Sequence, residues 1–476
     1  MKKVYLTTAI PYVNGRPHLG HAMDYLLADA YARYEKLKGN EVRFQAGTDE
    51  HGNKISKKAE EAGIEIHEFV DKNSAVFRDF TKQLGTSVTD FIRTTDEDHK
   101  RRCREIWKKL EPHIYKSEYE GWYCEGCERF VTQKEFDTNN GKCPDHNKKY
   151  EKLKEQNYYL KIADFKDEIR EKIESDKMKI LPEFRKNEVL KLLEDSPDVS
   201  MSRPKEHLSW GVEVPGDENQ VMYVWIDALS NYITVLGYPE EDIADFWPAE
   251  VQFVGKDVLR FHAIIWPAML LGLGLPLPKV LHSHGHILAN GQKMSKSIGN
   301  VVDPMEVLER YGLTAFRYYF LRHADTFLDH DFTWDQYDDA YNNELANDLG
   351  NLVQRLATLC QKQNLGGISF SPKVSPIYAE EMDKLYFSKA FDYAWKKITE
   401  INRKIDETKP WALAKENKID ELKSLLCELV DDLLQANQLL KPFIPEATEK
   451  IEQIFTAEEI MRPEVPLFPK KQLEET

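Results

Sequence analysis

Near the N-terminus, apolar segments alternate with amphipathic ones in the order expected of an α/β fold. Residues 4–10 are apolar and β-branched, which predicts a buried strand that ends at Pro11. A helical pattern then runs from Leu19 to Lys38 and ends at Gly39, and residues 42–46 predict the next strand. The order strand, helix, strand predicts a parallel sheet with a right-handed crossover.

This pattern is interrupted in the middle of the chain. From about Glu118 to Tyr150 the segments become short, polar and rich in Gly, Cys and Asn, so they cannot form much of a hydrophobic core. Apolar strand patterns return at residues 221–225 and 251–255. We therefore predict one Rossmann-type α/β domain that is split by a connective insertion. Its predicted halves cover residues 1–116 and 221–290, and the insertion covers residues 117–220.

Beyond residue 335 the periodicity becomes helical. Leucines recur at steps of three and four residues in two places, which predicts amphipathic helices, and a third helical segment runs from Met382 to Ile405. We predict a helix bundle over residues 336–476, joined to the α/β domain by residues 291–335. The two stripes are Leu345, Leu349, Leu352, Leu356 and Leu359, and then Leu422, Leu425, Leu426, Leu429, Val430, Leu433 and Leu434.

The composition narrows the class of protein. The chain of 476 residues has 65 Lys and Arg against 81 Asp and Glu, a formal net charge of −16, with 41% hydrophobic residues. These values exclude a disordered chain and a protein that coats nucleic acid by bulk positive charge. The longest uncharged apolar run, Ala263–Pro278, falls short of the roughly 20 residues that a bilayer requires. Six cysteines are too few for a disulfide framework, which predicts a cytoplasmic protein.

Two short motifs carry the clearest chemistry. His18, Gly20 and His21 precede a helix, whose N-terminus attracts phosphate and whose glycine lets a nucleotide approach the backbone. A lone histidine there is more often a satisfied helix cap, but two imidazoles at the end of a first strand favour a ligand site. Residues 293–297, Lys-Met-Ser-Lys-Ser, lie between glycines. They suit a lid over a triphosphate better than a merely solvated basic loop.

Together these motifs resemble the signatures of class I aminoacyl-tRNA synthetases. Pro17-His18-Leu19-Gly20-His21 resembles the HIGH signature, and residues 293–297 match the KMSKS signature letter for letter. Further landmarks are similar to those of methionyl-tRNA synthetases over nearly the whole chain. The resemblance implies a KMSKS-loop and stem-contact region at 291–335 and an anticodon-binding bundle at 336–476. It implies that His18, His21, Lys293 and Lys296 are catalytic, and that ATP contacts His18, Gly20, His21, Gly255, Asp257, Lys293, Ser295 and Lys296.

Four metal-ligating residues lie inside the predicted insertion. They form a C-x2-C pair followed by a C-x2-H pair, which suits tetrahedral Zn²⁺, whereas a redox C-x-x-C would not explain the second pair. Because protein fills all four positions, we expect the zinc to be structural and to hold together a lobe with a thin core. The family resemblance also implies a zinc knuckle. The ligands are Cys124, Cys127, Cys143 and His146, and the unpartnered cysteines predicted to lie in the core are Cys103, Cys360 and Cys427.

The same resemblance implies a methionine pocket. Asp49 follows the second predicted strand and would pair with the substrate ammonium. The other positions, taken alone, are typical core residues, and the resemblance makes them the enclosure of a polarizable thioether. A few relatives carry proline where this chain has Leu229. The implied pocket consists of Ala9, Ile10, Tyr12, Asp49, Trp225, Ala228, Leu229, Tyr232, Val258 and His262.

A polar stripe in the first bundle helix is the candidate for nucleic-acid recognition. Asn343, Asn347, Asn351 and Arg355 recur at steps of four, on a face distinct from the leucines, and such a stripe is usually a solvated face. The resemblance implies instead that Asn351, Arg355 and Trp411 read the CAU anticodon by hydrogen bonding and base stacking. Local positive charge is expected from Lys396, Lys397, Arg403, Lys404 and Lys409.

The implied activity is ATP-dependent activation of L-methionine, with Mg²⁺ accompanying ATP, and transfer of the methionyl group to the 3′-terminal adenosine of tRNA(Met). One alternative is a class I synthetase for cysteine, leucine, isoleucine or valine. The last three normally need a large editing domain, and a cysteine enzyme would use zinc inside its pocket. The other alternative is a non-catalytic tRNA-binding or zinc-binding paralogue, which should have lost some signature residues. An appended C-terminal domain found in many relatives is not visible, so we expect either a monomer or a separate tRNA-binding chain.

Overall fold

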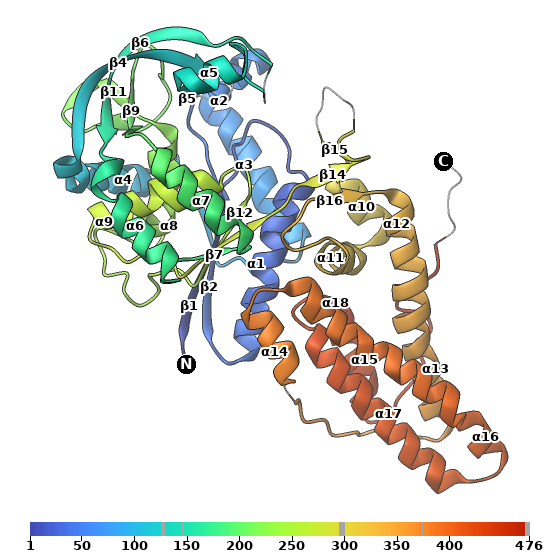
Figure 1. The fold of residues 1–476 in the computed structure, drawn as a ribbon. Coiled ribbons are helices and arrows are strands. Elements are labelled where there is room, and N and C mark those ends of the chain that lie inside the picture. Colours follow the sequence, from blue (N-terminus) through green and yellow to red (C-terminus); the bar gives the residue numbers. More distant parts are fainter. Residues whose placement is uncertain (125–128, 145–146, 295–299, 374, 472–476) are drawn as a thin grey trace. The chain divides into compact units, whose positions relative to one another are not determined.

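The computed structural model describes residues 1–124, 129–144, 147–294, 300–373 and 375–471 (Figure 1). Contacts within the chain group it into two compact units. The first consists of Met1–Pro17, Glu41–Lys82 and Val88–Ser283, and the second of His18–Asn40, Gln83–Ser87 and His284–Thr476. Each unit is therefore assembled from segments that are distant in the sequence.

The centre of the first unit is a parallel sheet. Its strand order in the described part of the chain is β3-β2-β1-β12-β13-β7. β1 pairs in parallel with β2 and with β12, β2 pairs with β3, and β13 pairs with β7. β1 and β12 are almost entirely buried, as expected for strands covered on both faces. The bounds are β1 Lys3–Thr8, β2 Glu41–Thr48, β3 Asp90–Arg93, β7 Lys179–Leu181, β12 Val251–Gly255 and β13 Val280–His284.

The order in which strands are added to this sheet changes side at β1. From β1 it adds β2 and β3 on one side, and it later returns to place β12 on the other side. In open parallel sheets such a switch point leaves a crevice at the carboxyl ends of the strands, where ligands bind. The segments that follow β1, β2 and β12 are therefore the first place to look for a site.

Helices pack around the sheet of the first unit and share one hydrophobic cluster with it. Trp107, Tyr232 and Trp266 are buried in this cluster together with Val254 of β12. The bounds of the helices in this cluster are α4 Glu97–Leu110, α6 Lys166–Glu174, α7 Phe184–Asp195, α8 Val224–Thr234, the π-helical turn η3 Phe261–Ile265, and α9 Trp266–Gly272. Two further helices, α2 Asn53–Ala62 and α3 Ile66–Gln83, belong to a separate small cluster with Val13.

Three of the four strands predicted in this unit are confirmed, and one is corrected. The strands expected at 4–10 and 42–46 are β1 and β2, and the one at 251–255 is β12. The apolar run at 221–225 instead contains the end of β11 (Asp217–Met222) and the start of α8. β11 belongs to a small sheet with the order β10-β11-β9 rather than to the main sheet. Periodicity cannot separate a short buried strand from a buried helix, and here the last two of the five residues are helical.

The predicted insertion is only partly a separate structure. β4 (Ile114–Cys124) and β6 (Glu151–Leu160) form a long antiparallel ladder, with β5 (Arg129–Val131) and β8 (Val199–Ser200) at its sides. β7, however, is a strand of the main sheet, and apolar residues of α6 and α7 lie in the main cluster. The range 117–220 therefore does not delimit an independent body. The remaining elements are η1 Glu111–His113, α5 Gln133–Thr138, η2 Ile162–Asp164, β9 Ser202–Pro204 and β10 Glu213–Val214.

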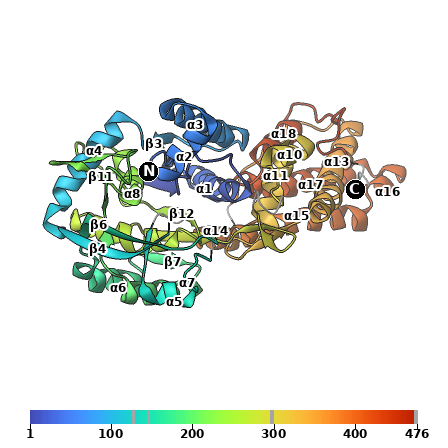
Figure 2. The same cartoon turned by 90° about the horizontal axis from the view of Figure 1, so that it is seen from above.

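The second unit is mainly helical. The long helices α15 and α17 pack side by side in it (Figure 2). No helix in the described ranges is long and apolar enough to cross a bilayer. The helices are α1 Leu19–Leu37, α10 Pro304–Tyr311, α11 Leu313–Arg322, α12 Trp334–Asp339, the π-helical η4 Ala340–Gly350, α13 Asn351–Lys362, α14 Pro376–Asp383, α15 Phe387–Thr408, α16 Pro410–Lys415, α17 Ile419–Leu440 and α18 Pro445–Phe455. The strands are β14 Ile287–Ala289, β15 Gln292–Lys293 and β16 His330–Phe332.

The leucine stripes predict these helices correctly, because most of their members are buried along η4, α13 and α17. Two details differ. The segment expected to be helical from Met382 to Ile405 is broken between α14 and α15, where Leu385 has a φ of 62°, a left-handed conformation that a helix cannot continue. Cys427, predicted to lie in the core, is exposed on α17, whereas Cys103 and Cys360 are buried.

One buried ion pair joins three segments of the second unit. Arg317 of α11 lies 2.7 Å from the carboxylate of Asp29 in α1, and both side chains are buried. The guanidinium also donates to the carbonyls of Phe443, Pro442 and Leu84. A buried guanidinium is tolerated only when its donors are satisfied in this way, so the pair fixes α1 against the helical part of the chain.

Candidate active site

The turn after β2 places a carboxylate at the switch point of the sheet. Asp49 is only 2% exposed, and its backbone continues the pairing of β1 with β2: its N–H donates to the carbonyl of Pro11 at 2.9 Å, and its carbonyl accepts from the N–H of Val13 at 3.2 Å. Tyr12 lies opposite Asp49 in the same register. Asp49 is therefore held rigidly at the edge where a ligand is expected.

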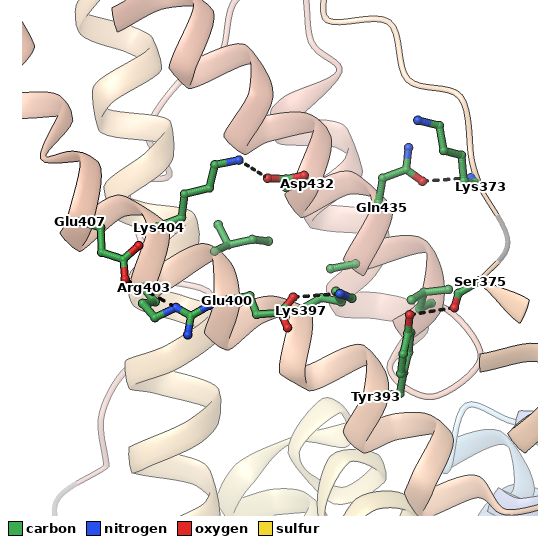
Figure 3. Close-up of a pocket in the computed structure, with 13 residues that line it drawn as sticks. Lys373, Ser375, Tyr393, Lys397, Glu400, Arg403, Lys404, Glu407, Asp432 and Gln435 are labelled. Atoms are coloured by element: carbon green, nitrogen blue, oxygen red, sulfur yellow. Dashed lines mark hydrogen bonds and ion pairs between the residues drawn. The ribbon is translucent and has the colours of Figure 1, made fainter. Parts of the chain in front are cut away.

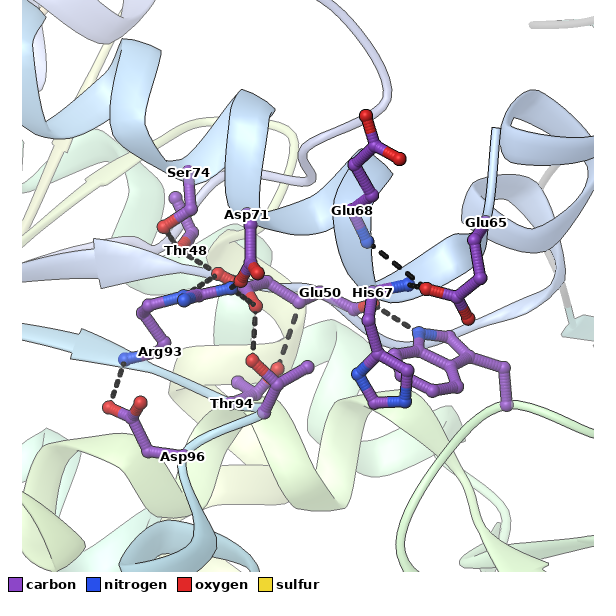
Figure 4. Close-up of polar contacts among 12 residues, drawn as sticks. Thr48, Glu50, Glu65, His67, Glu68, Asp71, Ser74, Arg93, Thr94 and Asp96 are labelled. Atoms are coloured by element: carbon purple, nitrogen blue, oxygen red, sulfur yellow. Dashed lines mark hydrogen bonds and ion pairs between the residues drawn. The ribbon is translucent and has the colours of Figure 1, made fainter. Parts of the chain in front are cut away.

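The next residue, Glu50, fixes this turn to the end of β3 (Figure 4). Its carboxylate accepts two hydrogen bonds from Arg93, each of 2.8 Å, and one from Thr48 at 2.7 Å, and the hydroxyl of Thr95 also donates to it. Its N–H donates to the hydroxyl of Thr94 at 2.9 Å. Because Glu50 is fully buried, this set of partners is required to offset the loss of hydration.

The third residue of the turn, His51, contacts α8. Its Nδ1 lies 2.5 Å from a carboxylate oxygen of Asp227. Among the described residues, His99, Cys103 and Asp227 also place one possible metal-ligating atom each within 4.8 Å of one another. Sequence reasoning missed Glu50 and this cluster. The available signal was Asp227 itself, a charged residue in an otherwise apolar helical run, which must have a buried partner.

Aromatic side chains form a wall beside Asp49. The rings of Tyr12 and Trp225 meet edge to face with their centroids 6.2 Å apart. Trp225 stacks on Phe261, the first residue of the π-helical turn, at 3.6 Å. π-Helical turns are often found at functional sites because the extra residue redirects side chains. The segments after β1, β2 and β12 thus meet at one edge of the sheet.

The deeper part of this wall contains a neutral histidine. His262 Nε2 lies 2.6 Å from the hydroxyl of Tyr232, and its Nδ1 lies 3.0 Å from the carbonyl of Val258. Burial lowers the pKa of His262 to about 4, so the imidazole is uncharged at neutral pH. Nδ1–H therefore donates to the carbonyl, and Nε2 accepts from Tyr232. This leaves a polar but uncharged pair in an apolar surrounding.

The other predicted pocket and nucleotide residues lie on the same elements of the first unit. Ala9 and Ile10 follow β1 and are half-buried, and Val258 follows β12. Ala228 and Leu229 are buried on α8, and Leu229 lies in the main hydrophobic cluster. Gly255, the last residue of β12, is buried, and Asp257 is exposed.

In the second unit, the first signature is a helix cap as well as a candidate ligand site. The ring Nδ1 of His18 accepts from the N–H of Gly20 at 3.1 Å, and Nδ1 of His21 accepts from the N–H of His18 at 3.1 Å. The two rings stack with their centroids 3.6 Å apart. Because both Nδ1 atoms accept, the proton of each neutral ring is on Nε2, the nitrogen that can donate to a phosphate oxygen.

Gly20 has a steric reason to be glycine. A Cβ atom at this position would lie 2.9 Å from Cε1 and 3.0 Å from Nδ1 of His18. Any other residue would therefore displace the His18 ring from its cap. Of the second signature, Lys293 ends the short strand β15, while Ser295 and Lys296 lie outside the described residues.

Two of the predicted zinc ligands lie together in the first unit. Cys124 and Cys143 are buried in one small cluster with Val131 and Tyr150. Cys143 is held in a tight turn, because its N–H donates to Lys148 at 2.8 Å and its carbonyl accepts from Asn147 at 2.8 Å. The other two, Cys127 and His146, lie outside the described residues. Two buried thiols in so small a core suit a soft metal ion.

The predicted base-reading residues are accessible on the helices of the second unit. Asn351 is exposed at the start of α13, and Trp411 is 41% exposed on α16. Arg355 is partly exposed, with its guanidinium 2.8 Å from Asp406. The distinct polar face expected for Asn343, Asn347, Asn351 and Arg355 agrees with their exposure, although η4 is π-helical rather than α-helical.

The positive charge expected near the base-reading residues is largely offset by carboxylates. A groove of about 550 Å³ between α15 and α17 contains three of the five predicted cations (Figure 3). Lys397 pairs with Glu400 at 2.8 Å, and Lys404 pairs with Asp432 at 2.8 Å and with Glu428 at 2.7 Å. Arg403 lies 3.8 Å from Glu407. This groove is therefore not a strongly positive surface, a feature that the spacing of lysines alone cannot reveal.

Comparison with known proteins agrees with this architecture. The chain matches the family model for class I tRNA synthetases (M) over residues 4–357. It is 41% identical to the methionine–tRNA ligase of Caldanaerobacter subterraneus, over 97% of this chain and 75% of the relative, and 43% identical to that of Listeria innocua, over 92% and 71%. The structure of Mycobacterium tuberculosis methionyl-tRNA synthetase in complex with methionyl-adenylate matches with a TM-score of 0.91 at 33% identity, covering 98% of this chain and 100% of that one.

The parallel sheet with its switch point, the signature at the start of α1 and these matches define a class I tRNA synthetase. Within that class, the identity and coverage of the relatives leave one family. The chain belongs to the methionine–tRNA ligases.

The contact between Gly20 and His18 gives a direct test of the first signature. We expect Gly20→Ala to slow ATP–pyrophosphate exchange at least about 10-fold, because the new methyl group displaces His18, while the unfolding temperature changes little. His18→Asn keeps an acceptor for the helix cap but removes the Nε2–H donor, and it should cause a similar loss. The double variant should lose no more than either single one. Additive losses would show that Gly20 does not act through His18.

Proposed function

We propose that the chain activates L-methionine with ATP and transfers the methionyl group to tRNA(Met). The observation that carries this proposal is the arrangement at the switch point of the first unit. There, a rigidly held carboxylate, Asp49, lies in register with Tyr12, and Tyr12 meets the aromatic wall of Trp225. A cationic end and an apolar end are the two features that an amino acid with an apolar side chain presents to its site.

Each end of methionine has a partner in this arrangement. The Asp49 carboxylate pairs with the substrate ammonium. The thioether lies against the aromatic wall and the Tyr232–His262 pair, because sulfur packs favourably at aromatic edges and accepts only weak hydrogen bonds. A neutral His262 favours an uncharged side chain, since a charged one would lose its hydration without a counterion. The remaining pocket residues, Ala9, Ile10, Ala228, Leu229 and Val258, close the apolar surface.

The first chemical step needs no general base. The methionine carboxylate is anionic at neutral pH, so one of its oxygens attacks the α-phosphorus of ATP and the bond to the β-phosphate oxygen breaks. Gly255 and Asp257 take the ribose side of ATP, and Gly20 and Ser295 contact the nucleotide. His18, His21, Lys293 and Lys296 stabilise the negative charge that develops on the leaving pyrophosphate. Mg²⁺ bound with ATP offsets part of the triphosphate charge.

The second step transfers the amino acid to tRNA. The 2′-hydroxyl of the terminal adenosine attacks the carbonyl carbon of methionyl-AMP, and AMP leaves. Anticodon recognition is assigned to the helix bundle, where the exposed Trp411 can stack on a base and Asn351 and Arg355 can bond base edges. Arg355 must exchange its contact with Asp406 to do so.

A structural zinc is proposed for Cys124, Cys127, Cys143 and His146. It is supported by the burial of Cys124 and Cys143 in one cluster whose apolar content is otherwise small. Besides that cluster, the lobe has the stack of Trp122 on Phe136, at 3.9 Å, which is too little to hold a fold alone. Zinc bound there would supply cross-links between the two halves of the lobe, and no catalytic chemistry.

The proposed activity is tested by ATP–pyrophosphate exchange with each of the twenty amino acids offered separately. Among the twenty, methionine should support exchange at least about 100-fold better than leucine, whose side chain is branched and lacks sulfur. Exchange with another amino acid would retain the class and contradict the pocket. A zinc-loaded protein that exchanges with none of them would contradict the proposed activity altogether.

Zinc content tests the proposed metal site. Purified protein should contain about one zinc per chain, and Cys124→Ser and Cys143→Ser should each lower this several-fold. Both variants should become sensitive to proteolysis within residues 114–160, because the lobe loses its cross-link. Cys360→Ser, a buried cysteine of the second unit, is the control and should keep its zinc. Equal zinc in all four proteins would contradict the assignment.

Trp411→Ala tests the anticodon surface. We expect it to lower kcat/KM for tRNA(Met) about 10- to 100-fold, as loss of a base stack predicts, without changing methionine-dependent exchange. Trp411→Phe retains an aromatic face and should recover most of the activity. An unchanged kcat/KM for tRNA in Trp411→Ala would place recognition elsewhere in the bundle.

A further inference from the structure

A buried polar network in the first unit surrounds the carboxylate of Asp227. His51 lies 2.5 Å from one carboxylate oxygen through Nδ1, and His99 lies 2.8 Å from the other through Nε2. The other ring nitrogen of His99, Nδ1, lies 2.7 Å from the hydroxyl of Thr234. The thiol of Cys103 lies 3.3 Å from His99 Nε2, on the side of Asp227. All five side chains are buried, so this network has no direct access to solvent.

The distances describe a hydrogen-bonded network rather than a metal centre. Two ligand atoms of a tetrahedral metal ion lie roughly 3.3 Å apart, whereas His99 Nε2 and Asp227 are at hydrogen-bond distance, 2.8 Å. Each imidazole donates one N–H to one carboxylate oxygen. Burial opposes ionisation of Asp227, but the charges and hydrogen bonds of His51 and His99 outweigh it and hold its pKa well below the usual range. The carboxylate is therefore charged, and it depends on both imidazoles.

Asp227 lies at the junction of the two segments proposed to hold methionine. On its own helix, Trp225 precedes it by two positions and Ala228 follows it directly. Its partner His51 lies two positions after Asp49, on the other side of the proposed site. A second contact, from Gln45 to Asn231 at 2.7 Å, joins β2 to α8 about one helical turn further along. These contacts fix α8 to β2 and to the turn after it, and the contact of His51 with Asp227 is the one beside the site.

We propose that Asp227 is a positioning residue for the amino-acid substrate. By holding His51, it sets the distance between the Asp49 carboxylate and the apolar wall on α8, and this distance determines the length of side chain that the site accepts. Asp227 does not touch the substrate. The inference rests on the proposed methionine site and names the interaction that fixes its dimensions.

The Asp49 carboxylate and the apolar wall come from different elements, a turn and a helix. The distance between them therefore varies unless a rigid contact joins the two elements. Binding sites must hold their groups to within about 0.5 Å, and a single methylene changes the preference of a site by only about 10- to 200-fold. A loosened contact should therefore admit a longer analogue before it abolishes the reaction.

The test exploits the nitrogen through which His51 binds. The side-chain amide of asparagine places its nitrogen near the position of Nδ1, so His51→Asn retains the contact, whereas His51→Leu removes it at similar size. ATP–pyrophosphate exchange is measured on the full chain with L-methionine and with L-ethionine, which is one methylene longer. We expect His51→Leu to raise the KM for methionine about 10-fold, with the KM for ATP changed less than about 2-fold. The ratio of kcat/KM for ethionine to that for methionine should rise about 10-fold, and His51→Asn should keep the wild-type ratio.

Thr234→Val is the matched control, because it removes a hydrogen bond of the same network without touching His51. It should lower the unfolding temperature and leave the ethionine-to-methionine ratio unchanged. An unchanged KM and ratio in His51→Leu would overturn the positioning role, and so would an equal change in Thr234→Val. If His51→Leu does not fold, Asp227→Leu, which removes the acceptor for His51 at similar size, replaces it, and a wild-type ratio in that variant overturns the role equally. A wild-type chain without methionine-dependent exchange would instead contradict the proposed function, so the two failures are distinguishable.

Discussion

The turn after β2 must place three consecutive polar residues, Asp49, Glu50 and His51, in a buried environment, and the rest of the first unit is arranged around that requirement. A buried charge without a partner costs several kcal/mol, so the turn is stable only because its neighbours satisfy it. Arg93 at the end of β3 donates to Glu50 through Nε and Nη2, and Asp227 of α8 accepts from His51. The parallel pairing that continues through Tyr12 then fixes Asp49, which directly precedes the two residues that make these contacts. The same interactions that make the turn possible also make it rigid.

In the second unit, the side chains proposed to bind the nucleotide also stabilise the fold, and this makes them rigid. His18 and His21 satisfy backbone donors at the start of α1, and this capping fixes both rings with Nε2 as the donor. Helix α1 is fixed in turn by the buried pair of Asp29 and Arg317, which also satisfies carbonyls near Phe443. The signature proposed to interact with a triphosphate is thus held in place by the fold of the helical unit itself. Preorganised donors of this kind need little rearrangement when charge develops.

Much of this architecture can be predicted from the sequence, and the exceptions have physical causes. The strands β1, β2 and β12 and the leucine stripes of η4, α13 and α17 follow from local periodicity, which is sensitive to burial on one or both faces. The apolar run at 221–225 misleads, because a buried helix and a buried strand look alike over so few residues. The helix break at Leu385 and the exposure of Cys427 depend on packing that no short motif records.

The residues of the candidate site also fall into a group that the sequence reveals and a group that it does not. The signature residues and Asp49 can be found from motifs because their chemistry requires particular residue types at short spacing. The partners that hold them cannot, since Arg93 and Asp227 are distant in sequence from Glu50 and His51 and are brought together only by the sheet. The ion pairs that offset Lys397 and Lys404 are equally invisible to a count of lysines. Electrostatic partners that are distant in the sequence therefore cannot be predicted from it.

The proposed recognition of the substrate ammonium group by Asp49 can be measured by calorimetric binding. L-Methionine and its analogue without the amino group, 4-(methylthio)butanoate, are titrated into the wild-type protein and into Asp49→Asn. The wild-type protein should bind methionine at least about 30-fold more tightly than the analogue, and Asp49→Asn should bind the two almost equally. If Asp49→Asn discriminates between the two ligands as strongly as the wild-type protein does, the ammonium is bound elsewhere and the account of this site is wrong.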